Sequence, residues 1–395
     1  MDIHLYIRER ILSMELNVSI LKEIEDSRQE ALDLLMELGK IPAPSNHEEK
    51  RAAFCKDWLE KQGAQGVYID EALNVVYPVG NVEEGPLVIF MAHTDVVFPD
   101  TEELPMRIEG GKLYCPGIGD DTIHVVALLM AAKHIAKNKL TPKEGGMLLV
   151  ANSGEEGLGN LKGCKKIFEK YGDRVTEFVT FDGPFGSIDS GKICTTAVGS
   201  KRYKIEIDTE GGHSYGMFGN RNAIAYLASL IDTLYTIKVP NRGKTTYNVG
   251  IISGGTSVNT IAQHAEMLYE FRSDNREDLA EMEQHLNAAL AFYATKGIKI
   301  TTTVVGNRPC GIEVDKARHD ALIARTQATV EKFFGFTPVC GSASTDCNIP
   351  LSMGIPAVEV SCGRGRGAHT REEYIEIDSQ VPGIKLAFEM ILYHM

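Results

Sequence analysis

The chain has 395 residues, a formal net charge of −13 and 43% hydrophobic residues. This length favours two domains, and the acidic balance excludes nucleic acid as a partner, because no basic stripe is available to neutralise phosphates. No apolar run reaches the roughly 18 residues of a membrane helix, and the first residues lack the apolar core of a signal peptide, so no membrane partner is expected. The eight cysteines include no Cys-X-X-Cys pair, which favours reduced thiols in a cytoplasmic protein.

The first half of the chain alternates between helical and strand-like patterns. Apolar spacing predicts helix over residues 19–63, interrupted by two prolines, with a second helix running from Ser45 to Trp58. Strand-like segments follow at residues 74–79, 87–92, 148–151 and 178–181, and a helix is predicted at 123–137. This alternation predicts an α/β domain with a central, mostly parallel sheet flanked by helices. Functional residues are then expected at the carboxyl ends of its strands.

The pattern changes near Ala197. Segments 202–209, 246–252, 265–272 and 298–305 alternate like strands, and 222–235 and 279–294 are amphipathic helices. Their order, β-α-β-β-α-β, is the ferredoxin-like arrangement. A helix at 315–334 and a strand at 357–361 then resume the α/β pattern. The sequence therefore predicts a catalytic domain in two parts, residues 1–196 and 308–395, with a ferredoxin-like domain, residues 197–307, inserted between them.

Several short motifs place imidazoles and carboxylates just after predicted strands. In chain order they are His93 and Asp95 in MAHTDVV, Asp120 and Asp121 in GIGDDT, Glu155 and Glu156 in SGEEG, Asp182 in FDG, and His369 in GAHT. Singly, each has a plainer interpretation, such as a helix N-cap for the aspartate pair or a solvated turn for the glutamate pair. Together they predict a two-metal hydrolytic site, and ligands without thiolates suit zinc, with cobalt or manganese as substitutes.

Some roles follow from the chemistry of these residues. Asp95 lies two residues beyond His93 in an extended segment, so its carboxylate can accept a hydrogen bond from the second ring nitrogen of that histidine. A carboxylate of the aspartate pair can bridge two cations. One member of the glutamate pair can ligate a metal while the other acts as general base. The Gly-Arg run at 363–367 lacks the Lys-Ser/Thr and the strand-to-helix switch of a phosphate loop, and is interpreted as a flexible loop.

The motif set resembles that of the dinuclear zinc exopeptidases and amidohydrolases that include peptidase T, carboxypeptidase G, aminoacylase and succinyl-diaminopimelate desuccinylase. The resemblance covers most of the chain, in motif order and in the inserted domain. The roles that it implies are metal ligation by His93 with Asp182 and by Glu156 with His369, bridging by Asp120, support by Asp95, and general base catalysis by Glu155. The implied cofactor is two Zn²⁺ per chain, for which Co²⁺ or Mn²⁺ can substitute.

The resemblance extends to three residues of the inserted domain. His213 in GGHS resembles the histidine that reaches the partner subunit's active site and stabilises an oxyanion. Asn259 in GGTSVN resembles a substrate-binding asparagine, and Arg272 in EFRSD resembles the arginine that grips a substrate carboxylate. A homodimer through the inserted domain is therefore implied. One departure stands after the aspartate pair, where Thr122-Ile123-His124 replaces the family's usual Lys-Gly or similar small pair.

The expected activity is metal-dependent hydrolysis of an amide bond in a small substrate with a free carboxylate, as in a dipeptidase, tripeptidase or carboxypeptidase. Glu155 would take a proton from the attacking water, whose pKa two metals lower toward about 7, and return it to the leaving amine. One alternative is an N-acyl amino acid deacylase. Another is a non-catalytic binding protein on a peptidase scaffold, which the retention of Glu155 beside all five ligands disfavours, because a binder needs no general base.

Overall fold

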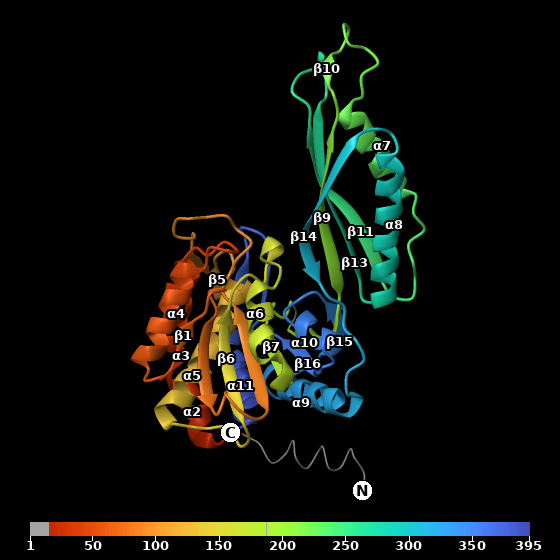
Figure 1. The fold of residues 1–395 in the computed structure, drawn as a ribbon. Helices are drawn as coiled ribbons and strands as arrows, with labels where there is room; N and C mark the ends of the chain where they lie inside the picture. Colours follow the sequence, from red (N-terminus) through yellow and green to blue (C-terminus); the bar gives the residue numbers. More distant parts are fainter. Residues whose placement is uncertain (1–15, 187) are drawn as a thin grey trace. The chain divides into compact units, whose positions relative to one another are not determined.

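Figure 1 shows a computed structural model of the chain, in which residues 16–186 and 188–395 are described. The N-terminal segment in which no signal peptide is predicted lies outside the described residues. The chain divides into two compact units: unit 1 combines Met1–Thr196 with Glu313–Met395, and unit 2 is Ala197–Ile312. The predicted insert ends at 307 rather than at Ile312. The difference arises because Cys310, beyond the last strand of unit 2, still packs in the core of that unit.

The main sheet of unit 1 has eight strands in the order β1-β2-β6-β3-β7-β16-β8-β15. Their bounds are β1 (Tyr68–Ile69), β2 (Val75–Gly80), β3 (Leu87–His93), β6 (Gly146–Asn152), β7 (Val175–Phe181), β8 (Lys192–Ala197), β15 (Val339–Ala343) and β16 (Ala357–Val360). The central strands β6, β3, β7 and β16 run parallel, whereas β2 and β8 run antiparallel to their neighbours. The predicted α/β class with a mostly parallel central sheet is confirmed.

A smaller sheet of unit 1 has the order β17-β18-β5-β4. Its strands are β4 (Arg107–Glu109), β5 (Lys112–Tyr114), β17 (Gly365–Arg366) and β18 (Tyr374–Glu376). The segment predicted as a flexible loop at 363–367 therefore contains a paired strand. Its Arg364 donates a hydrogen bond to the carbonyl oxygen of Phe334 at 2.8 Å. The prediction was wrong because a strand of two residues, paired only with β18, is too short to show an alternating pattern.

Helices cover both faces of the main sheet. They are α2 (Val18–Asp26), α3 (Arg28–Lys40), α4 (Glu49–Lys61), α5 (Ile123–Asn138), α6 (Lys162–Tyr171), α9 (Lys316–Phe334), α10 (Asn348–Ser352) and α11 (Gln380–Leu392). On one face α5 contacts β3, β6 and β7 as well as α3, α4 and α11. Val179 and Phe181 of β7 share a core with α5. Phe178, directly before Val179 in the strand, points to the other face, where its ring centroid lies 5.5 Å from that of Phe168 in α6.

Two predicted helices differ from the observed ones. The first helical stretch is two helices that meet at Ser27, and the helix predicted to begin at Ser45 begins at Glu49. Before Glu49 the chain makes a turn, in which Asn46 has a φ of 74° and the main-chain N–H of His47 bonds to the carbonyl oxygen of Pro44. Ser45 therefore lies outside the helix, and its hydroxyl can form a hydrogen bond with another part of unit 1.

Unit 2 is an antiparallel sheet of order β11-β13-β9-β14 with both of its long helices on one face (Figure 1). Its elements are β9 (Gly199–Asp208), β10 (Gly212–His213), α7 (Ala223–Tyr235), β11 (Thr245–Gly254), β12 (Thr260–Ile261), β13 (His264–Ser273), α8 (Arg276–Ala294) and β14 (Lys299–Arg308). Both helices contact β9 and β13, and the core includes Ile205, Met267 and Leu230. The long elements follow one another as β-α-β-β-α-β, so the ferredoxin-like prediction is confirmed.

Within the described residues, no helix is both long enough and apolar enough to cross a membrane. All eight cysteines lie in the described part of the chain, and they are free thiols rather than disulfides. Seven of them are buried and only Cys340 is exposed. The interpretation of the cysteines as reduced thiols agrees with this structure.

Candidate metal centre

The predicted metal ligands meet at the carboxyl ends of the parallel strands of unit 1. His93 is the last residue of β3, Asp182 directly follows β7, and Glu156 lies in the turn after β6. Asp120 belongs to the turn that leads into α5, and His369 to the loop between β17 and β18. Strand ends gather functional groups in this way because all parallel strands finish at the same edge of the sheet.

Asp120 lies between the two histidines of this cluster. Its Oδ1 is 3.0 Å from Nε2 of His93, and its Oδ2 is 3.2 Å from Nε2 of His369. The same ring nitrogen of His369 lies 2.9 Å from Oε1 of Glu156, and that of His93 lies 3.8 Å from Oδ1 of Asp182. One carboxylate therefore faces two separate histidine–carboxylate pairs, one with each oxygen. This is the arrangement that a bridging ligand needs, although the assignment of each residue to a metal stays a prediction.

The donor atoms of the cluster suit divalent cations. Ligand atoms of His93, Asp120, Asp121 and Asp182 lie within 4.8 Å of one another, and so do those of Asp120, Glu156 and His369. Imidazole nitrogens and carboxylate oxygens are the donors that zinc, cobalt and manganese accept. These residues therefore fit a pair of metal ions by chemistry and by spacing.

The electrostatics of the cluster also favour added positive charge. Burial raises the pKa of Asp182 and of Glu156, because a carboxylate loses hydration in these surroundings. Hydrogen bonds that His369 donates to the carboxylates of Asp120 and Glu156 raise the pKa of His369 to about 10. A pKa raised this far means that the surroundings of His369 are negatively charged. Metal ions bound among these groups would supply the missing positive charge.

Asp95 supports the cluster through His93 and through the turn of the two glutamates. Nδ1 of His93 lies 3.0 Å from the main-chain oxygen of Asp95 and 3.4 Å from its Oδ1, so the main-chain oxygen is the closer acceptor. The carboxylate of Asp95 also accepts the main-chain N–H groups of Glu155 and Glu156, each at 3.0 Å, and the hydroxyl of Ser45 at 2.6 Å. Asp95 therefore holds the turn that carries both glutamates in place, because its carboxylate accepts a main-chain N–H group from each of them.

Asp121 and the residues after it form a buried wall beneath the ligands. Oδ2 of Asp121 accepts the main-chain N–H of His93 at 2.7 Å, and its Oδ1 lies 2.6 Å from Nδ1 of His124. Burial lowers the pKa of His124 to about 3. Oγ1 of Thr122 accepts a hydrogen bond from the guanidinium of Arg51 at 3.1 Å. Thr122, Ile123 and His124, which depart from the family's usual pattern, are thus buried beside the ligands rather than exposed to a substrate.

Two supporting residues were not predicted from the sequence. Ser45 donates to Asp95, and Glu373, which is fully buried, accepts main-chain N–H groups of the turn that carries Asp120. Glu373 stands in the charged run Arg371-Glu372-Glu373, which resembles a solvated surface. The available signal was its position four residues after His369, close enough for both to share one loop.

The three residues predicted in the insert lie in unit 2, at two separate places. His213 pairs with Thr260 in the β10–β12 ladder, and the main-chain N–H of Ser214 bonds to the carbonyl oxygen of Asn259 at 3.0 Å. His213 and Asn259 are therefore neighbours. Arg272 lies eight residues beyond His264, the first residue of β13. At about 3.3 Å per residue this is roughly 26 Å along the strand.

Arg272 already holds a carboxylate within unit 2. Its Nε lies 3.0 Å from Oε1 of Glu270 and its second guanidinium nitrogen lies 3.1 Å from Oε2. Arg202 donates to the same carboxylate at 3.2 Å. The planar fork of Arg272 is thus oriented by Glu270, and a substrate carboxylate would have to use its remaining N–H groups or displace this partner.

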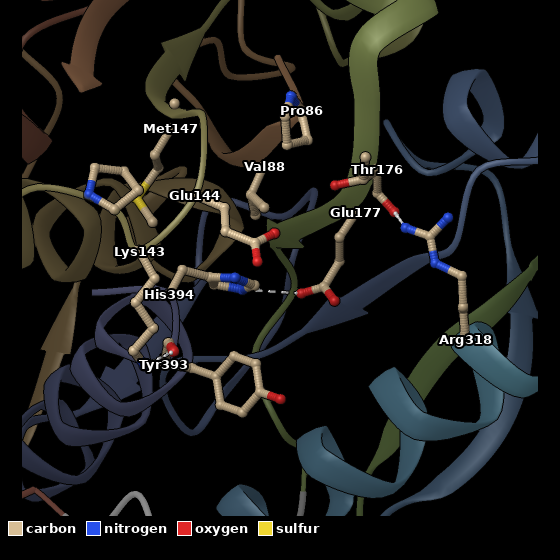
Figure 2. Close-up of a pocket in the computed structure, with 12 residues that line it drawn as sticks. Pro86, Val88, Lys143, Glu144, Met147, Thr176, Glu177, Arg318, Tyr393 and His394 are labelled. Carbon is tan, nitrogen blue, oxygen red and sulfur yellow. Dashed lines mark hydrogen bonds and ion pairs between the residues drawn. The ribbon is translucent and has the colours of Figure 1, made fainter. Parts of the chain in front are cut away.

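A separate cavity of unit 1 lies elsewhere. Figure 2 shows this space of about 530 Å³, lined by Val88, Met147 and Glu177 near the starts of β3, β6 and β7. Glu177 points toward His394, whose Nε2 is 3.1 Å from its Oε1. Because the metal ligands follow the opposite ends of these strands, the cavity is not part of the candidate metal centre.

Comparison with known proteins gives one family and many similar folds. The family described as Peptidase family M20/M25/M40 matches residues 89–393. The succinyl-diaminopimelate desuccinylase of Corynebacterium glutamicum is 25% identical over 354 residues, which are 87% of this chain and 91% of that protein. A tripeptidase from Staphylococcus aureus has a TM-score of 0.73 at 22% identity, covering 93% of this chain and 99% of its own. An M20 family metallo-carboxypeptidase from Sulfolobus solfataricus has a TM-score of 0.72 at 18% identity, covering 92% and 99%.

Proposed function

Because the chain belongs to peptidase family M20/M25/M40 and is therefore a metal-dependent hydrolase of amide bonds, we propose that it cleaves a small peptide or N-acyl amino acid with a free carboxylate. The observation that carries the proposal is the position of Asp120 between two histidine–carboxylate pairs, beside the turn of Glu155. The proposed cofactor is two Zn²⁺ per chain, with His93, Asp182, Glu156, His369 and Asp120 as ligands.

Bound metals would polarise the scissile carbonyl and make the attacking water more acidic. Glu155 takes the proton of that water and passes it to the leaving amine. Its side chain is only 5% exposed, and one of its oxygens lies within 4.8 Å of ligand atoms of both His93 and Glu156. Asp95 accepts the N–H groups of both glutamates, so it keeps the base in place relative to the neighbouring ligand.

His213 has the hydrogen bonds of an oxyanion donor. The main-chain N–H groups of Tyr215 and Gly216 approach its Nδ1 at 3.3 and 3.2 Å. A main-chain N–H can only donate, so Nδ1 is the acceptor and the proton of the neutral ring resides on Nε2. The exposed Nε2–H is then available to stabilise negative charge on the substrate oxygen during attack.

We further propose a homodimer in which His213 of each chain completes the site of its partner. An extended dipeptide spans only about 7 Å, whereas His213 and Arg272 of one chain are separated by roughly the 26 Å of β13. One small substrate therefore cannot contact both residues from the same chain. Tyr215 and Phe218, which follow His213, are each 90% exposed and would be covered by a partner.

A second candidate is deacylation of an N-acyl amino acid. It is favoured by the similarity to a succinyl-diaminopimelate desuccinylase over most of both chains. A non-catalytic binding protein is the third candidate, and Glu155 beside a complete ligand set disfavours it. The three differ in what they release, so products distinguish them.

The test combines elemental analysis with a panel of dipeptides, tripeptides and N-acyl amino acids. We expect close to two divalent metals per chain and hydrolysis of at least one substrate class. A chelator should abolish the activity, and zinc, cobalt or manganese should restore it. Turnover that survives exhaustive chelation would contradict the proposal, and metal-loaded protein that binds these compounds without cleaving them would favour the binding protein.

The carboxylate requirement has its own test. Amidation of the substrate's C-terminus should lower kcat/KM strongly. A carboxylate accepts two parallel N–H groups of Arg272, one on each oxygen, whereas a neutral amide has only one acceptor oxygen. Arg272→Ala should lower kcat/KM for the acid and leave the amide nearly unchanged, and Arg272→Lys should restore only part of the discrimination. Equal rates on acid and amide with the unaltered protein would refute the role of Arg272.

A further inference from the structure

Glu373 joins the two loops that carry Asp120 and His369. Its Oε1 accepts the main-chain N–H groups of Gly119 at 2.7 Å and Asp120 at 2.8 Å, and its Oε2 accepts that of Gly117 at 2.8 Å. Its own main-chain oxygen accepts the N–H of Cys115 at 3.1 Å. The side chain is 0% exposed, so water cannot replace these bonds.

The chemistry of this cradle requires a carboxylate. Three N–H groups converge on one side chain, and only a group with two acceptor oxygens and no donor can satisfy all of them. Space is also limited, because a Cβ added at Gly119 would lie 3.2 Å from Oε1 of Glu373. The turn before Asp120 is therefore shaped around this carboxylate.

The same residue closes the loop of His369. Glu373 donates its main-chain N–H to the carbonyl oxygen of Thr370 at 3.3 Å, and Thr370 donates its own to Gly367 at 2.9 Å. The next residue, Tyr374, begins β18 and pairs with Tyr114 of β5. One end of the His369 loop is thus fixed at the point from which Glu373 holds Asp120.

We propose that Glu373 is a positioning residue of the metal centre, which sets the place of Asp120 relative to His369. Oδ2 of Asp120 and Nε2 of His369 are 3.2 Å apart. Glu373 fixes that separation through the main chain of the two loops and needs no contact with either of these atoms. The inference rests on the proposed metal centre. It predicts that the metal shared by Asp120, Glu156 and His369 depends on a side chain that never touches it.

The test is metal binding by Glu373→Gln, which keeps the size of the side chain and replaces one acceptor oxygen with a donor NH₂. At least one of the three N–H groups then faces another donor. We expect the affinity for Zn²⁺, measured by competition with a chromophoric chelator, to fall about ten- to a hundredfold. The absorption spectrum of the Co²⁺-loaded protein should change as well, because the ligand geometry is altered.

Glu372→Gln is the matched control. It makes the same change one residue earlier, at an exposed side chain whose partner is Arg107, and it should retain the affinity and the spectrum of the unaltered protein. Glu373→Asp keeps both acceptor oxygens on a shorter stem and should bind with intermediate affinity. If Glu373→Gln does not fold, the Asp variant carries the test by the same two measurements.

Two results would overturn the inference. One is a folded Gln or Asp variant with unaltered Zn²⁺ affinity and Co²⁺ spectrum. The other is a variant whose only change is a lower melting temperature of the metal-free protein, since this would mean a role in packing alone. Failure of the proposed function is seen separately, because the unaltered protein would then bind no metal or cleave no amide.

Discussion

Glu155 and Glu156 have the same side chain and adjacent positions, yet the fold gives them different surroundings. Oε1 of Glu156 lies 2.9 Å from Nε2 of His369 and joins the group of ligand atoms around Asp120. Glu155 is outside that group, although the same carboxylate of Asp95 holds its main-chain N–H. A turn that separates two identical groups in this way can assign metal binding to one and proton transfer to the other.

We therefore predict opposite effects for two equivalent substitutions. Glu155→Gln should retain its metals and lose turnover by about 10²–10⁴-fold, because the amide cannot accept the proton of the attacking water. Glu156→Gln should lose occupancy of one metal. Elemental analysis and steady-state kinetics on both variants measure this. Equal loss of metal in the two variants, or an active Glu155→Gln, would show that the roles are assigned wrongly.

Ser45 provides a second test of how the glutamate turn is held. Ser45→Ala removes the 2.6 Å hydrogen bond to Asp95, and hydrogen bonds to charged groups contribute about 1.5–3 kcal/mol. We expect kcat at saturating metal to fall roughly tenfold, because the glutamate turn is held less firmly, with the metal content unchanged. Ser45→Thr keeps the hydroxyl and should recover most of the activity. An Ala variant with unaltered kcat would mean that Asp95 needs no third donor.

Among the helices and strands, the sequence predicts best those that carry a pattern of their own. The buried strands β3, β6 and β7 were predicted within three residues of their observed ends, because apolar runs bounded by polar turns are visible locally. Strands β8 and β15, with sequences KICTTA and VCGSA, were missed because short strands of mixed polarity resemble loops.

The same distinction applies to the candidate site. His93, Asp120, Glu156 and Asp182 were found because each follows a recognisable strand or motif. The bonds of Ser45 to Asp95 and of Glu373 to Gly117 join positions far apart in the chain. Contacts of this kind leave no periodicity in the sequence, so they become visible only when the elements are placed in space.

The packing of α11 gives a prediction about an element. Gly383 lies so close to the segment after β16 that an added Cβ would be 1.6 Å from the carbonyl oxygen of Cys362. Gly383→Ala must displace the helix or that segment, and we expect the free energy of unfolding to fall by at least about 1–3 kcal/mol. Gly186→Ala is the control, because none of the described residues, apart from its chain neighbour, lies within 4 Å of the added atom. Urea denaturation of both variants would contradict this if their midpoints agreed.

The proposed exchange of His213 between the two chains of a dimer can be tested by complementation. Glu155→Gln and His213→Ala chains should each be nearly inactive. A heterodimer of the two contains one site with both residues intact, so activity should reappear when subunits exchange. The control is each variant mixed with itself under the same conditions. Proven heterodimers without activity, or a fully active monomer, would mean that His213 acts within its own chain or not at all.

The position of β16 has a consequence for how the protein is made. This strand lies between β7 and β8 in the sheet, but it follows unit 2 in the chain, whereas both of its neighbours precede unit 2. During synthesis the sheet therefore lacks the strand between β7 and β8 until β16 has been made. Unit 2 is the continuous segment Ala197–Ile312, so it can already fold during that time. Until the last part of the chain, with His369, has been translated, the exposed edges of β7 and β8 remain available to foreign strands. The main sheet is thus completed only after both the insert and β16 have been made.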